Sequence, residues 1–266
     1  MKWVALSITF LLAGCGDREV LPPGDGQRIV SLSPAITRTL VDLGLHDDLV
    51  GRSAFCRSVD QNIPVVGDLD GIDYERLVRL CPTHVLVQDT AGWPPQPLLD
   101  MASEGDFTLQ AWPLDRLEDI DRVLRELPCV LDADEANAEV FRTALRSPLA
   151  SADGRSAMLL TEGQLAFGRG TWIDDLWREM GGLNVLNAEG WVQLSNEDLA
   201  RRSAELLIVL SDQGLSLKEQ MMYRTLPTVR KGESRFVPII LEDAMLPSTG
   251  VVEVRAALAH ALSQVP

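Results

Sequence analysis

Short apolar runs alternate with amphipathic segments along most of this chain. In the first half, residues 28–33 form a run of β-forming residues, and residues 34–43 form an amphipathic helical pattern that stops at Gly44. The second half repeats this order, with an apolar run at residues 157–161 and a helical pattern at residues 172–180. Strands that alternate with helices in this way predict an α/β fold, with a parallel sheet covered by helices.

One longer amphipathic stretch, residues 132–149, separates the two halves. Asp132 and Glu135 have the D-x-x-E spacing of a capping box, apolar residues recur at steps of three and four, and Pro148 marks the end. A helix of this length would extend about 25 Å. It fits either a crossover helix within a single α/β domain or a strut that joins two lobes.

Two glutamates occupy matching places in the two halves. Glu75 opens a helical segment that leads to the buried run at residues 86–87, and Glu197 opens one that leads to residues 208–209. The helix dipole favours a glutamate in the first turn of any helix, which would explain each one singly. Their repetition favours the strut and suggests two lobes related by a pseudo-twofold axis.

The first 27 residues have the pattern of a targeting segment followed by a tether. Lys2 precedes an apolar run at residues 3–12, which is too short to span a membrane. The sequence Leu-Ala-Gly-Cys that ends at Cys15 resembles the bacterial lipobox. This resemblance implies that residues 1–14 are a signal peptide and that Cys15 carries a lipid anchor outside the cytoplasm. The polar residues 15–27 then form a flexible tether.

Composition narrows the possible functions. The chain has 266 residues, 46% of them hydrophobic, and a formal net charge of -15, so an acidic surface would repel nucleic acid. Its three histidines share no ligand spacing, and the H-E-x-x-H and G-x-S-x-G motifs are missing, which argues against a metal site and against a hydrolase. Cys56, Cys81 and Cys129 allow one disulfide, without indicating the pair.

Several segments, taken in order, resemble one protein family. The first half contains RIVSLSPAITRTLVDLGLHDDLVG, FC, PVVGD and PTHVLV; the second contains GRGTWIDDLWREMGGLNV, WVQLSNEDL, LPTVRKGESRFVPI and LPSTGVVE. Together, over residues 28–262, they are similar to class III substrate-binding proteins of ABC importers, of the cobalamin and ferric-siderophore type. Thr83-His84 and Ser248-Thr249 depart from the usual residues of the family, which bears on the ligand and not on the fold.

The resemblance implies two Rossmann-like α/β lobes joined by one long backbone helix, with a ligand cleft between the lobes. The N-terminal lobe would comprise residues 28–114, the linker residues 115–150 and the C-terminal lobe residues 151–266. The protein would be a non-enzymatic periplasmic monomer without a cofactor, which delivers a cobalamin-like corrinoid, a ferric siderophore or haem to a permease homodimer with ATPase subunits. By position, Glu75 and Glu197 match the glutamates with which the family docks onto permease arginines.

Large ligands of this kind are bound by aromatic and apolar walls with a few polar groups, and open α/β sheets bind ligands at loops that follow strands. The residues in such places are Ser33, Pro34, Phe55, Cys56, Trp93, Trp112, Arg169, Trp172 and Trp191. Taken singly, a tryptophan in a loop is more often packed than bound to a ligand. Arg169 has the alternative of pairing with Asp174 or Asp175.

The identity of the ligand stays open at this point. The acidic charge disfavours highly anionic siderophores, unless Arg52, Arg57 and Arg169 make the cleft locally basic. The pair Phe55-Cys56 is closer to the cobalamin branch of the family. A sensory or scaffolding lipoprotein with a degenerate cleft is the alternative function.

Overall fold

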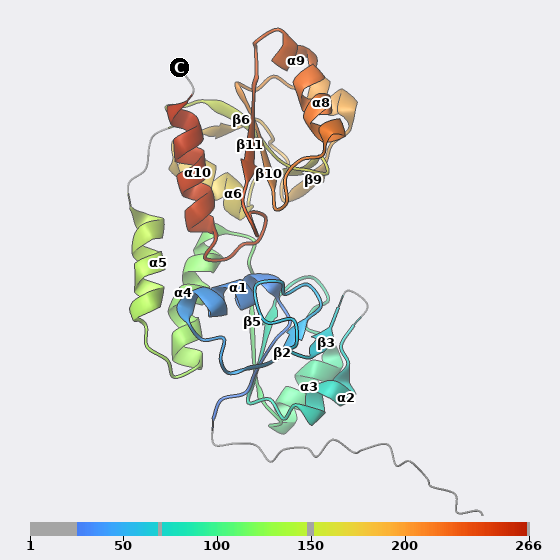
Figure 1. Ribbon diagram of the computed structural model, residues 1–266, viewed down its shortest axis with the longest axis vertical. Helices are drawn as coiled ribbons and strands as arrows, with labels where there is room; N and C mark the ends of the chain where they lie inside the picture. Colours follow the sequence, from blue (N-terminus) through green and yellow to red (C-terminus); the bar gives the residue numbers. More distant parts are fainter. Residues whose placement is uncertain (1–25, 69–70, 148–151, 265–266) are drawn as a thin grey trace, which may run out of the picture.

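The computed structural model describes residues 26–68, 71–147 and 152–264, which form two α/β lobes stacked along the long axis of the molecule (Figure 1). The two-lobe α/β class predicted from the sequence is confirmed. The predicted signal peptide, Cys15 and nearly all of the tether lie outside these residues. Among the residues described, no helix has both the length and the apolar character that crossing a bilayer requires.

The N-terminal lobe contains a parallel sheet with the strand order β3-β2-β1-β4-β5. Its strands are β1 (Ile29–Ser31), β2 (Leu49–Ser53), β3 (Val65–Gly67), β4 (His84–Gln88) and β5 (Thr108–Trp112). The crossover helices are α1 (Pro34–Leu43), α2 (Tyr74–Arg79) and α3 (Gln96–Glu104). α1 packs on one face of the sheet through Ile36 and Leu40, whereas α2 and α3 cover the other face with Leu77 and Leu98.

The C-terminal lobe has a mixed sheet with the strand order β11-β10-β6-β7-β9, and β8 also pairs with β6. Its strands are β6 (Ser156–Thr161), β7 (Leu165–Phe167), β8 (Leu183–Asn184), β9 (Trp191–Gln193), β10 (Leu206–Ser211) and β11 (Arg235–Ile240). β7 runs antiparallel to both β6 and β9. The all-parallel sheet expected from the sequence is therefore wrong at this edge, because strands of three residues are too short to give a periodic pattern.

The helices of the second lobe divide between the two faces of its sheet. They are α6 (Trp172–Glu179), α7 (Asn196–Arg201), α8 (Leu217–Thr225), α9 (Pro227–Arg230) and α10 (Val251–Ser263). α7 and α8 pack on one face through Leu199 and Tyr223, and α6 and α10 pack on the other through Trp177 and Leu258. Apart from the short helix α9 before β11, the order α7–β10–α8–β11 repeats the order α2–β4–α3–β5 of the first lobe, which supports the pseudo-twofold relation.

The linker between the lobes contains two helices, α4 (Leu117–Val130) and α5 (Ala136–Arg146). The long helix predicted at residues 132–149 corresponds to α5, which begins four residues later than predicted, and the end predicted at residue 149 lies outside the described residues. Asp132 has a φ of 46°, so it lies in the turn that closes α4 and cannot cap α5. Instead, the Asp134 carboxylate accepts the Ala136 N–H at 2.9 Å. The capping-box prediction failed because aspartate also tolerates the left-handed conformation of a helix end.

α5 nevertheless joins the two lobes. Near its start, the Asn137 amide donates to the Leu43 carbonyl at the end of α1, at 3.0 Å. At its other end, the Arg255 guanidinium of α10 donates to the carbonyls of Ala144 and Leu145. A cation placed there offsets the negative end of the helix dipole and satisfies carbonyls that have no partner within the helix. The strut of the predicted architecture is thus a helix of eleven residues supported by α4.

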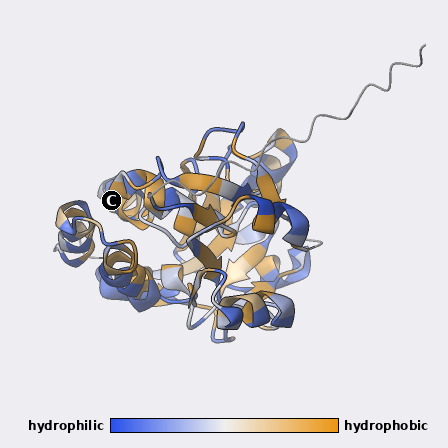
Figure 2. Ribbon diagram, turned by 90° about the horizontal axis from the view of Figure 1, so that it is seen from below, coloured by the Kyte–Doolittle hydropathy of each residue, from blue (hydrophilic) through white to orange (hydrophobic). Residues whose placement is uncertain are grey.

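One hydrophobic core runs through both lobes on the side of the linker. It includes residues of α1 in the first lobe, of α4 and α5, and of α6 and α10 in the second lobe. Figure 1 shows α4, α5 and α10 on this side, with α2, α3 and α8 on the opposite side. Figure 2 shows hydrophobic residues concentrated on the strands and on the sides of the helices that face the sheets.

Candidate functional site

The residues that follow the carboxyl ends of the strands in the two lobes face each other, and we call this region the interlobe face. Arg57, which follows β2, is close enough to Asp212, which follows β10, to affect the pKa of that carboxyl. Arg38 of α1 lies 3.5 Å from Asp243, which follows β11, and 3.1 Å from Glu253. Open α/β sheets bind ligands at such an edge, so the candidate site is here.

Ser33 and Pro34, both predicted to contact the ligand, begin α1. The Ser33 hydroxyl accepts the Ile36 N–H at 3.4 Å and is buried, and the partly buried Pro34 occupies the first helical position. These are the residue types that favour a helix N-terminus. The structure therefore gives Ser33 a capping role, and ligand contact by Ser33 and Pro34 stays a prediction.

Phe55 and Cys56 are neighbours in sequence, but their side chains lie in different environments. Phe55 is 43% exposed, whereas Cys56 is fully buried with its sulfur 3.0 Å from the Thr37 hydroxyl. The aromatic residue is therefore available to a ligand, and the prediction for Cys56 is corrected to a core role. Cys56, Cys81 and Cys129 are all free, so the disulfide that the sequence allowed does not form among them.

The two tryptophans predicted in the N-terminal lobe differ in the same way. Trp112 is the last residue of β5 and is buried, and its indole N–H donates to the Glu126 carboxylate of α4 at 2.7 Å. It belongs to the core beside the linker, which corrects the prediction that it contacts ligand. Trp93 is partly buried, and its backbone pairs with that of Thr90 in the loop that follows β4.

Three aromatic side chains meet in the C-terminal lobe. Trp191 starts β9 and pairs with Phe167 at the end of β7, and their ring centroids are 4.3 Å apart. Trp172 also contacts Phe167, edge-on with ring centroids 6.1 Å apart, and is buried, so its predicted ligand contact is corrected to a packing role. Trp191 is 45% exposed, so this cluster presents one indole ring to an apolar ligand.

Arg169 is exposed but already has a partner. Its guanidinium donates to the Asn187 side chain at 2.7 Å, rather than pairing with Asp174 or Asp175 as the sequence allowed. The backbone before Arg169 lies very close to a neighbouring loop. A Cβ on Gly168 would therefore lie 2.2 Å from the Ala188 carbonyl oxygen. Glycine is therefore required at position 168.

Sequence reasoning missed the acidic side chains of the interlobe face. Glu162 and Asp212 directly follow β6 and β10, and Asp243 lies three residues beyond β11. Burial raises the pKa of Asp212, and the nearby Asp243 and Glu162 carboxylates raise it further. The available signal was the presence of acids immediately after three predicted strands.

Ion pairs also connect the lobes at the linker. The Arg116 guanidinium, just before α4, makes two hydrogen bonds of 2.7 Å to the Asp175 carboxylate of α6. This paired geometry is the strongest that an arginine and a carboxylate form. The Asp175 carboxylate raises the pKa of Arg116, so this guanidinium stays charged.

Glu75 and Glu197 occupy equivalent positions, as the sequence suggested. Each is the second residue of a six-residue helix, α2 or α7, and each forms an ion pair with the arginine four residues later, Arg79 or Arg201. Both side chains are mostly exposed. Exposed pairs of this kind are weak, so both carboxylates are available to an external partner.

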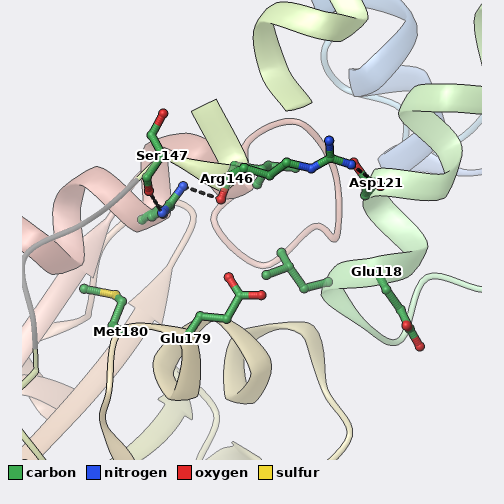
Figure 3. Close-up of a pocket in the computed structure, with 9 residues that line it drawn as sticks. Glu118, Asp121, Arg146, Ser147, Glu179 and Met180 are labelled. Carbon is green, nitrogen blue, oxygen red and sulfur yellow. Dashed lines mark hydrogen bonds and ion pairs between the residues drawn. The ribbon is translucent and has the colours of Figure 1, made fainter. Parts of the chain in front are cut away.

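A cavity of about 540 Å³ lies on the linker side, between α4, α5, α6 and α10. Figure 3 shows the Glu179 carboxylate pointing into it and Arg146 paired with Asp121. Burial raises the pKa of Glu179, and Arg255 opposes that shift. Because the arginines of this cavity already bind Asp121 and the end of α5, we assign it a structural role.

Comparison with known proteins identifies the family. The sequence profile described as periplasmic binding protein matches residues 29–233. The chain belongs to the periplasmic binding protein family. Among curated relatives, it is 24% identical over 236 residues to the vitamin B12-binding protein of Photorhabdus laumondii, covering 80% of this chain and 82% of the relative. It is 28% identical over 205 residues to that of Yersinia pestis, covering 73% and 72%.

Solved structures share the fold of this periplasmic binding protein. The periplasmic vitamin B12-binding protein of Vibrio cholerae superposes with a TM-score of 0.70 at 22% identity, covering 89% of this chain and 96% of that one. A periplasmic haem-binding protein of Pseudomonas aeruginosa gives a TM-score of 0.68 at 20% identity, covering 89% and 92%.

Membership in the periplasmic binding protein family fixes the general class of function. The protein is a non-enzymatic substrate-binding protein of a transport system and acts outside the cytoplasm. Within the described ranges, no cluster of three or more His, Cys, Asp or Glu side chains is arranged to hold a metal ion.

Proposed function

We propose that this protein binds a corrinoid of the vitamin B12 type at the interlobe face and delivers it to an ABC permease. The sequence relatives named above are vitamin B12-binding proteins. The observation that carries the choice of ligand is the acidic character of the interlobe face, where Glu162, Asp212 and Asp243 follow the strands of one lobe and Arg57 lies opposite.

The other arginines that could make this face basic have partners elsewhere. Arg52 is 5% exposed and donates to backbone carbonyls, including that of Ile63 at 3.1 Å. Arg169 donates to Asn187. Haem propionates and anionic siderophores would meet repulsion here, whereas the amide side chains of a corrinoid carry no charge. Phe55 and Trp191 supply the apolar contact area that a large ring system needs.

The proposed partner is a permease homodimer with ATPase subunits. Glu75 and Glu197 would each contact an arginine of one permease subunit, so that a symmetric partner recognises both lobes at once. Charge pairs of this kind set the rate and the register of association more than the affinity. The protein would act as a monomer, held at the membrane by a lipid on Cys15, without a cofactor.

Tryptophan fluorescence tests the ligand. Cyanocobalamin at micromolar or lower concentration should quench the tryptophan fluorescence of the purified protein. Haem and an anionic ferric siderophore should change this fluorescence only weakly. Preference for the siderophore would reject the corrinoid. Absence of binding to all three would favour a sensory or scaffolding lipoprotein with a degenerate cleft.

Charge reversal tests the docking sites. Glu75→Lys and Glu197→Lys should each abolish cobalamin uptake by cells, because each replaces attraction to a partner arginine with repulsion. Cyanocobalamin affinity of the purified variants should stay unchanged, since both side chains lie on the outer surface. Normal uptake by both variants would reject the docking assignment.

A further inference from the structure

Exposed apolar side chains lie on the helices beside the proposed docking glutamates. Leu217 and Met221, one turn apart on α8, are 79% and 63% exposed. In the other lobe, Val78 of α2 and Leu99 of α3 are also exposed. Exposed apolar side chains that adjoin on one helix, as Leu217 and Met221 do, are typical of an interaction surface, whereas isolated ones are common on any protein.

The topology places these residues on one side of the molecule. α2 and α3 share one core cluster, and α7 and α8 share another, and both clusters are separate from the core that contains α4, α5 and α10. In Figure 1, α2, α3 and α8 accordingly lie opposite α5 and α10.

In the C-terminal lobe, Leu217 and Glu197 also lie at the same end of the sheet. α2 and α7 each lead into a parallel strand, so Glu75 and Glu197, in their first turns, lie near the carboxyl ends of the strands. α8 begins at that same end with Leu217. The Gln164 amide bonds Asn196 at 2.9 Å and contacts Met222, which ties the start of α7 to α8.

We propose that Leu217 and Met221 are apolar anchors of the docking surface. The proposal rests on the proposed transport function and extends it. The partner it predicts is the extracytoplasmic face of the permease, with a basic side chain beside an apolar depression on the subunit that receives the C-terminal lobe. Interfaces of this composition place apolar side chains at the centre and charges at the rim.

Charge decides against the other occupants of this surface. A second copy of this chain would bring glutamate against glutamate, and both copies carry a formal net charge of -15. An anionic lipid surface would repel the same glutamates. A basic protein surface is the partner that both the acidic and the apolar residues fit.

The test measures binding of the protein, loaded with cyanocobalamin, to the permease–ATPase complex from the same cells in lipid nanodiscs. The variant Leu217→Gln/Met221→Gln removes the apolar surface but keeps two good helix formers. We expect its Kd to rise about 10- to 100-fold, since each apolar anchor of an interface contributes on the order of tenfold. Val140→Gln is the matched control, because Val140 is 67% exposed on α5, on the opposite side.

The outcomes separate this inference from the function on which it rests. Wild-type binding by the double variant, together with loss of binding by Glu197→Lys, would refute the apolar anchors and leave the proposed function standing. If Glu75→Lys and Glu197→Lys also bound normally, the proposed function itself would fail. A lower Tm or weaker cyanocobalamin binding in the double variant would show a structural role instead. Equal loss of binding to empty nanodiscs would point to lipid as the partner.

Discussion

Replacing Trp191 with alanine tests whether the interlobe face holds an apolar ligand. Trp191 is 45% exposed and its ring rests on Phe167. That exposed share of an indole side chain amounts to roughly 110 Å². At about 25 cal/mol per Å², full coverage by a ligand would contribute about 2.8 kcal/mol, or about 100-fold in Kd. Ligands seldom cover a side chain completely, so we expect cyanocobalamin affinity to fall by about 10- to 100-fold.

Isothermal titration calorimetry with cyanocobalamin measures this loss without relying on tryptophan emission. Trp112→Phe is the matched control, because Trp112 is buried against α4 and its indole N–H is bonded to Glu126. The control should lower the Tm and leave the Kd unchanged. An unchanged Kd in Trp191→Ala, or a loss equal to that of the control, would refute the assignment of Trp191 as a ligand wall.

Two further predictions concern stability. Gly182→Ala places a Cβ 2.2 Å from the buried ring of Trp177, and we expect about 3 kcal/mol of destabilisation in urea unfolding, which the second change Trp177→Leu should partly restore. Asp212→Asn should raise the Tm at pH 7, because a folded-state pKa above its usual range makes the ionised carboxylate destabilising. The gain should vanish as the pH falls through that raised pKa towards the ordinary value near 3.9, where wild-type Asp212 is protonated. A Tm difference that is independent of pH would contradict the raised pKa.

The sequence predicted the architecture well where periodic patterns are long. Helix α1 follows the predicted residues 34–43, since an apolar face, a capping serine and Gly44 at φ 76° all agree. The antiparallel pairing of β7 with β9 escaped prediction because each strand has three residues. The boundary of α5 was wrong because Asp132 suits both a cap and a left-handed turn.

The candidate site was harder to predict than the fold. Trp112, Trp172 and Trp191 look alike in sequence, yet the first two are buried and the third is half exposed. Tertiary packing decides which face of a strand or helix meets the other lobe. The position of a tryptophan at the start or end of such an element does not reveal that face. An acidic residue directly after a strand, such as Asp212 after β10, is a usable signal, but it does not by itself distinguish a residue of the interlobe face from a solvated loop residue.

The contacts between the lobes determine whether a permease could distinguish the ligand-loaded from the empty protein by the distance between the lobes. The core on the linker side continues from α1 through α4 to α6 and α10, so separating the lobes would expose apolar surface and would also break the partly buried ion pairs Arg38–Asp243 and Arg116–Asp175. The lobes should therefore keep nearly the same relative position with and without ligand. It follows that the spacing of Glu75 and Glu197 is set by the fold and not by the ligand, and a permease that distinguishes loaded from empty protein must sense the interlobe face itself.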